Sequence, residues 1–179
     1  MKSWQEWRIE TIVDRLLQGG PVCRHAADYI LGHDVRIGFA RQSTGGRWTL
    51  GGDIELNPEY CSPATDPEGA QLLGLVVHEA AHLEQGAALA LSVAGEVLGW
   101  KAEYAARSEL RAPLTNPHWR TIVRILDPPS DHDLRLARAE MLKVAGRRYL
   151  IWLLPLRPNF WTRWVERFQP LSARRKHRA

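Results

Sequence analysis

The chain has 179 residues, of which 45% are hydrophobic and 25% charged, and this is enough for one domain with an apolar core. That composition excludes collagen-like and disordered proteins, and a total of two cysteines excludes a disulfide scaffold or a cysteine-rich zinc module. The formal charge of +4 is concentrated at the C-terminal end, since the chain from Arg163 onward has six Lys or Arg and one acid. The remainder is close to neutral, so nucleic-acid binding by the whole domain is not expected.

The predicted elements begin with two helices and a small sheet. Apolar positions at helical spacing predict a helix over 4–18, and a shorter helix fits 22–31. Alternation over 35–40 and short apolar segments at 48–50 and 54–56, separated by glycine-rich turns, predict an antiparallel meander.

Helices dominate the rest of the chain. They are expected from about residue 66 past Leu83, and then over about 93–110, 117–126, 131–149 and 159–168. The expected fold class is therefore α+β, with a small antiparallel sheet packed on the helix that passes Leu83 and additional helices toward the C-terminus.

Location and domain organisation follow from the distribution of apolar residues. The N-terminal residues lack the long apolar segment of a secretory signal, so a cytoplasmic location is expected. The apolar stretch 72–100 carries His78, Glu79 and further acids, which are costly to bury in lipid, although an intramembrane metalloprotease stays an alternative. Residues 1–168 are expected to form a single domain, and 169–179 a basic, flexible tail.

One segment carries a chemical signature, His78-Glu79-Ala80-Ala81-His82, within an apolar stretch that is itself predicted to be helical. Positions i and i+4 lie on one face of a helix, one turn apart, so both imidazoles can reach one metal ion. Glu79 lies on the adjoining side, where it can reach a water on that metal. Two histidines and a glutamate are costly to bury among apolar residues without a partner, which favours metal binding over a purely structural role.

A catalytic zinc site needs a third protein ligand, and the downstream residues offer several. If the chain bends near 89–92 and a second helix returns antiparallel, Glu96 lies at the height of His82 and is the preferred third ligand. Glu103 lies roughly 10 Å further along the helix and is the alternate, or it orients a ligating histidine. His118 is a third choice.

This motif, with a glutamate on the next helix, resembles the zincin metallopeptidases, specifically the gluzincin type. The resemblance covers about residues 53–110. The chain differs from the metzincin pattern, because no Gly-x-x-His follows His82, and from gluzincins with an acid four residues after the ligand glutamate, because Trp100 is there. The resemblance implies a zinc-dependent hydrolase, a small gluzincin-like metallopeptidase that acts on peptides or proteins.

The resemblance also implies a role for each residue. His78, His82 and Glu96 would hold one Zn²⁺ ion, which lowers the pKa of its bound water toward about 7. Glu79 would take the proton as that water attacks a peptide carbonyl, and would deliver it to the leaving amine. An edge strand before the motif helix holds the substrate in such folds, and residues 48–56 are the counterpart here.

The oxyanion stabiliser stays open at this stage. Tyr104, eight residues after Glu96 and on nearly the same helical face, is the preferred catalytic candidate. Tyr60, His118 and His132 are alternatives, and each also has the ordinary interpretation of a partly buried aromatic residue or a surface histidine.

Functions of other classes compete with the peptidase hypothesis. The chain could bind metal in a zincin fold without turnover, and the metal could be a divalent ion other than zinc. It could instead be an adaptor that acts through its C-terminal segment, where aromatic residues such as Trp161 and Trp164 are interspersed with arginines. Such a segment is typical of a packed helix with a solvated end, of contact with an anionic membrane surface or, less so, of nucleic-acid binding.

Overall fold

The computed structural model describes residues 3–66, 68–112 and 114–167, which form eight α-helices, two 3₁₀-helices and one three-stranded sheet. The α+β class expected from the sequence is confirmed. Within these residues, no helix is both long and apolar enough to cross a membrane. The tail predicted over 169–179 lies outside the described residues.

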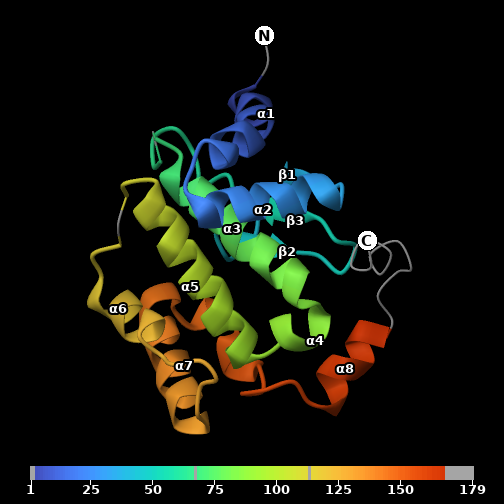
Figure 1. The fold of residues 1–179 in the computed structure, drawn as a ribbon, viewed down its shortest axis with the longest axis vertical. Coiled ribbons are helices and arrows are strands. Elements are labelled where there is room, and N and C mark those ends of the chain that lie inside the picture. Colours follow the sequence, from blue (N-terminus) through green and yellow to red (C-terminus); the bar gives the residue numbers. More distant parts are fainter. Residues whose placement is uncertain (1–2, 67, 113, 168–179) are drawn as a thin grey trace.

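The two N-terminal helices begin and end within a residue or so of the predicted positions. Helix α1 (Trp4–Leu17) begins at a capping box, in which Ser3 and Glu6 satisfy each other's backbone N–H groups. Helix α2 (Pro21–Gly32) has proline at its first position, where a missing N–H costs nothing. Figure 1 shows α2 crossing over the central helix of the protein.

The sheet is mixed, and the predicted antiparallel meander is wrong. Its strands are β1 (Ile37–Phe39), β2 (Gly46–Trp48) and β3 (Ile54–Leu56), in the order β1-β3-β2, with β1 parallel and β2 antiparallel to β3. Alternation of apolar residues sets the face of each strand but not its neighbour. The side-chain amide of Asn57 donates to the backbone carbonyl of Gln42 and so joins the β1–β2 loop to the end of β3. Strand β2 lies at an edge of the sheet.

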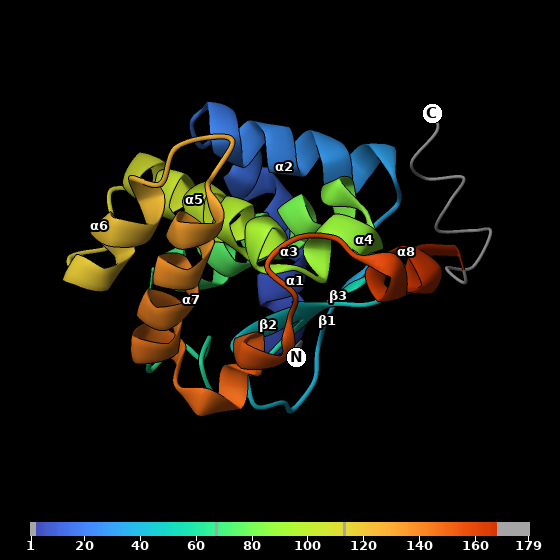
Figure 2. The same ribbon diagram turned by 90° about the horizontal axis from the view of Figure 1, so that it is seen from below.

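Two long helices lie side by side through the centre (Figures 1 and 2). They are α3 (Ala70–Gln85) and α5 (Val93–Glu109), and a single turn, α4 (Ala87–Ala90), joins them. Helix α3 ends at Gly86, whose φ of 76° favours glycine, and the turn α4 was not expected from the sequence. The central pair is thus a helical hairpin with a tight corner.

The C-terminal half packs on the outer side of α5 and continues to a separate short helix. Its elements are α6 (Pro117–Val123), α7 (Asp131–Ala145), the 3₁₀-helices η1 (Arg147–Tyr149) and η2 (Ile151–Leu153), and α8 (Phe160–Arg167). The helix predicted over 131–149 ends at Ala145, because Gly146 has a φ of 74° and turns the chain. Figure 2 shows α6 and α7 on one side of the central pair and α8 on the other.

The apolar core has two parts that meet at the central helices. One joins α1, α2, the sheet and α3 through residues such as Leu16, Leu56 and Val76. The other joins α5, α6, α7 and η2 through residues such as Val97 and Ile122. Because α3 and α5 face each other between the two parts, polar side chains on their shared faces are enclosed by both.

Candidate metal centre

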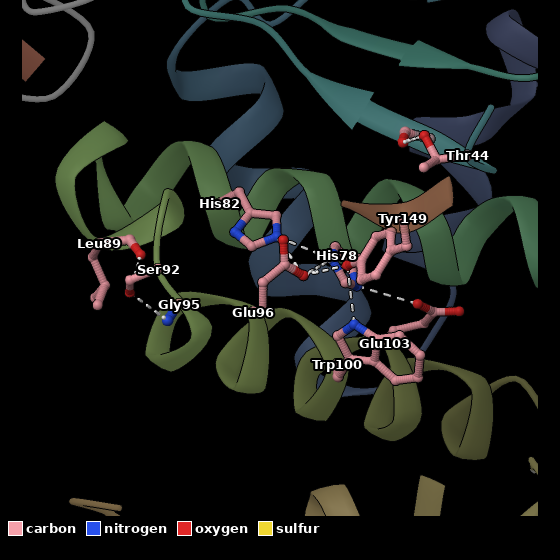
Figure 3. A network of polar contacts seen from close by, with 11 residues as sticks. Thr44, His78, His82, Leu89, Ser92, Gly95, Glu96, Trp100, Glu103 and Tyr149 are labelled. Atoms are coloured by element: carbon pink, nitrogen blue, oxygen red, sulfur yellow. Dashed lines mark hydrogen bonds and ion pairs between the residues drawn. The ribbon is translucent and has the colours of Figure 1, made fainter. Parts of the chain in front are cut away.

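Helix α3 begins at a buried carboxylate and presents both motif histidines to α5. Asp66 accepts hydrogen bonds from the backbone N–H groups of Gln71 and Leu72, at 3.2 and 2.8 Å, which satisfies donors that a helix start leaves free. One turn separates His78 from His82, and their residues are only 5% and 2% exposed. The i, i+4 spacing therefore brings both imidazoles to the α3–α5 interface, as Figure 3 shows.

Helix α5 begins one turn before Glu96. The Ser92 hydroxyl accepts from the Gly95 N–H at 3.2 Å and donates to the Leu89 carbonyl at 2.7 Å, which caps the helix. A Cβ at Gly95 would lie 2.1 Å from the Leu89 carbonyl oxygen, so this close turn requires glycine. Although α3 ends before the predicted bend, Glu96 still comes level with His82.

The structure brings three potential ligand atoms together. Nε2 of His78 and Nε2 of His82 are 3.0 Å apart, and Oε2 of Glu96 is 3.6 Å from each of them. Ligand atoms bonded at about 2.0–2.2 Å to a tetrahedral zinc ion lie about 3.4 Å apart, so both the donor types and their spacing fit such an ion. The third position of this group is taken by Glu96, the preferred candidate, and not by Glu103.

Glu103 instead contacts the outer nitrogen of His78. Its Oε2 is 3.2 Å from Nδ1, and because a carboxylate only accepts, Nδ1 is the donor and Nε2 is the nitrogen that can bind a metal ion. Glu103 comes seven residues after Glu96, whereas the gluzincins mentioned above have an acid four residues after the ligand glutamate. Gly99 lets the ring approach α5, since a Cβ there would lie 3.0 Å from Nε2 of His78. No described residue pairs with the buried Nδ1 of His82 in the same way.

A hydroxyl from the C-terminal half completes the network (Figure 3). Tyr149, in η1, donates to Oε2 of Glu96 and accepts from Nε1 of Trp100 at 3.1 Å. Trp100, four residues after Glu96, is thus linked to Glu96 through the hydroxyl of Tyr149. The sequence analysis missed Tyr149, because it lies 53 residues after Glu96 in a segment without a motif. Nothing in the local sequence marks it.

Glu79 lines a cavity of about 350 Å³, and of the three ligand candidates His78 also lines it. The cavity lies between β2, α3, α5 and η1, and its lining includes Gly46, His78 and Tyr149. A Cβ at Gly46 would lie 2.9 Å from Oε1 of Glu79, so β2 approaches this carboxylate closely only because the residue is glycine. Glu79 is 5% exposed and forms no hydrogen bond or ion pair within the described chain. Its carboxylate is available for proton transfer.

The charges around the cluster agree with these contacts. Burial opposes protonation of His78, but its hydrogen bond with Glu103 and its contact with the carboxylate of Glu96 outweigh burial and raise the pKa of the imidazole. Burial alone would raise the pKa of Glu96, but the neighbouring His82 and His78 lower it well below its usual range. Burial raises the pKa of Glu79, which suits a carboxylate that accepts a proton. Burial and the nearby Glu96 also raise the pKa of Tyr149, so its hydroxyl stays a donor.

The other candidates from the sequence lie mostly elsewhere. Tyr104 packs against the second part of the core and does not line the cavity. His118 pairs through Nδ1 with Glu140, and His132 is exposed. Tyr60 does line the cavity, near its mouth, and is 46% exposed.

Comparisons of this chain with protein families, with curated proteins and with solved structures found no match. The interpretation of the site therefore depends on its own geometry and chemistry.

Proposed function

We propose that the protein is a zinc-dependent hydrolase, a metallopeptidase of the gluzincin type. The observation that carries this proposal is the convergence of His78, His82 and Glu96 at 3.0 to 3.6 Å, beside the unpartnered carboxylate of Glu79. A buried histidine pair with a purely structural role does not need a further buried acid at a cavity. Such an acid is costly unless it has a chemical task.

In this proposal each side chain of the site has its own role in peptide hydrolysis. His78, His82 and Glu96 would hold a zinc ion, which would supply a Lewis acid and lower the pKa of water at the site to about 7. Glu79 takes the proton of the attacking water and passes it to the leaving amine. Glu103 keeps His78 in the tautomer that a ligand needs. Tyr149 donates its single O–H to Glu96 and so orients that ligand. Tyr104 does not line the cavity, so Tyr60, which does, is the remaining tyrosine candidate for the oxyanion donor.

The sheet offers a place for the substrate backbone. Strand β2 is at an edge of the sheet, and Gly45 and Gly46 line the cavity next to Glu79. An extended peptide can add to such an edge through main-chain hydrogen bonds. The edge strand expected within 48–56 is thus better assigned to residues 46–48, the bounds of β2.

Elemental analysis and one substitution test the proposal. Purified wild-type protein should contain one equivalent of zinc, and His78→Ala should lose it. Glu79→Gln should keep the metal and abolish hydrolysis of peptides. Hydrolysis by the Glu79→Gln protein would refute the assignment of the base, and wild-type protein that lacks a bound ion would refute the metal centre. Protein that holds zinc but hydrolyses no peptide in a mixed library would support a catalytically silent zincin fold instead.

A second function is favoured by the surface of α8. Phe160, Trp161 and Trp164 are 71%, 68% and 47% exposed, and the exposed Arg163 and Arg167 lie among them. Exposed tryptophans beside arginines are typical of helices that lie on an anionic membrane surface. This contact would place the hydrolase on the membrane. Sedimentation with vesicles of phosphatidylserine and phosphatidylcholine tests it, and Trp161→Ser should reduce binding while the zinc content stays unchanged.

A further inference from the structure

The cavity beside the metal centre contains one cationic side chain whose donors are incompletely used. Among the described residues that line it, Arg107 is the only Lys or Arg. Its Nε is buried and has no hydrogen-bond partner. Its nearest ion pair joins Nη1 to Oε1 of Glu103 at 3.8 Å, which is too long for a hydrogen bond. A guanidinium has five N–H donors, so this side chain has capacity for a further acceptor.

The position of Arg107 is fixed by packing. A Cβ at Gly74 of α3 would lie 2.8 Å from Cγ and 3.0 Å from Cδ of Arg107, so the alkyl stem crosses α3 where no side chain is in the way. The side chain is 18% exposed, and that of Glu103 is 7% exposed. The guanidinium is therefore held at the cavity wall and does not extend into solvent.

Glu103 does not neutralise this charge by itself. The same carboxylate accepts a hydrogen bond from Nδ1 of His78 through its other oxygen, at 3.2 Å. The contact of Glu103 with His78 is thus shorter than its contact with Arg107, and Arg107 interacts more weakly with this carboxylate. A second anion in the cavity would complete the contacts of the guanidinium. A carboxylate fits best, because its two oxygens can accept two parallel hydrogen bonds from the planar guanidinium.

We propose that Arg107 is a specificity-determining residue that binds a carboxylate of the substrate, either the C-terminal carboxylate of a peptide or an acidic side chain. The inference rests on the proposed peptidase function and names the substrate class of that site. Glu103 contacts both Nδ1 of His78 and Nη1 of Arg107, so these two nitrogen atoms are at most roughly 10 Å apart. Two or three extended residues span that distance at about 3.5 Å each. The anchored carboxylate thus lies within two or three residues of the bond that is cut.

The rest of the cavity supports a peptide end rather than a small inorganic anion. Leu75, Trp100, Leu114 and Trp119 also line it, and together they offer an apolar surface for the side chain next to the carboxylate. A volume of about 350 Å³ is at the lower end of small-molecule sites and suits one or two residues of a peptide.

Binding of paired inert ligands tests the inference without turnover. The ligands are N-acetylphenylalanine and its amide, measured by calorimetry on the Glu79→Gln protein in its metal-bound form. The free acid should bind about 10- to 100-fold more tightly than the amide, as expected for a charge-assisted hydrogen bond. A second pair, the α-amides of N-acetylglutamate and N-acetylglutamine, moves the carboxylate into a side chain and identifies which source the site prefers.

Substitutions then assign the preference to Arg107. In Arg107→Gln the acid and the amide should bind equally in both pairs, and in Arg107→Lys a smaller preference should remain. Arg120→Gln is the matched control, because Arg120 is exposed on α6 and does not line the cavity. Peptide turnover should show the same pattern: in Arg107→Gln, the ratio of kcat/KM for a peptide with a free C-terminal carboxylate to kcat/KM for its C-terminal amide should fall.

Two results overturn the inference, and a third separates it from the proposed activity. A preference for the acid that persists in Arg107→Gln would show that the carboxylate binds elsewhere, for example on the metal. Equal binding of acid and amide to the parent protein, or no binding of either, would show that Arg107 has only a structural role. If wild-type protein hydrolyses no peptide but the acid preference depends on Arg107, the proposed activity fails and the anion site stands.

Discussion

Replacement of Glu103 should weaken zinc binding although this residue is not one of the three ligand candidates. Its Oε2 is 3.2 Å from Nδ1 of His78, and both side chains are 7% exposed. Loss of an outer hydrogen-bond partner of a ligand histidine typically reduces metal affinity 10- to 100-fold, or by about 1.4 to 2.7 kcal/mol. Glu103→Gln keeps an acceptor for Nδ1 and loses only the charge, so we expect about a tenfold loss. Glu103→Ala removes the acceptor, and we expect about a 100-fold loss.

The assay is competition for zinc against a chromophoric chelator near neutral pH. Glu84→Gln is the matched control, because it removes the same charge from α3 at an exposed position that pairs with His25. Urea unfolding of the metal-free proteins shows whether each variant is folded. Wild-type zinc affinity in both folded Glu103 variants would refute the reasoning, since it would mean that the contact with His78 does not act on the metal.

The surroundings of His78 and Glu96 support three further tests. Because the pKa of His78 is raised above its ordinary value of 6.5 in the metal-free protein, its ion pairs stabilise the fold fully below that pH, and the free energy of unfolding should fall as pH rises through the raised pKa. Urea unfolding should show this fall in wild type and a flatter profile in His78→Gln; equal slopes would contradict it. Gly99→Ala, whose Cβ would lie 3.0 Å from Nε2 of His78, should reduce zinc affinity about tenfold without loss of fold stability, whereas Gly32→Ala, with nothing within 4 Å, should not. Tyr149→Phe removes the donor to Glu96 and should also weaken zinc binding about tenfold in the same chelator assay, and an unchanged affinity would refute its role.

The helices that carry the site could be predicted because their limits are encoded locally. Ser92 caps α5, and a glycine with positive φ ends α3 at Gly86. The same kind of signal at Gly146 ends α7, four residues before the predicted limit. The pairing of the strands could not be predicted in the same way. It depends on contacts between distant residues, such as the parallel pairing of Ile37 with Ile54, which no local pattern encodes. The helical part of the fold was therefore predictable, and the sheet order was not.

The periodicity of α5 explains which site residues could be found. At about 100° per residue, Glu103 and Arg107 lie about 20° to either side of Glu96, so all three face α3, whereas Tyr104 is turned by about 80°. That rotation is enough to pack Tyr104 into the second part of the core, and it shows why a spacing of eight residues was a poor guide. Helical periodicity does not predict the residues on the side of the cavity opposite α5. Tyr149 reaches Glu96 only because the chain turns after α7. The hydrogen bond from its hydroxyl to Glu96 is therefore a tertiary contact, which the helical pattern of α5 does not predict.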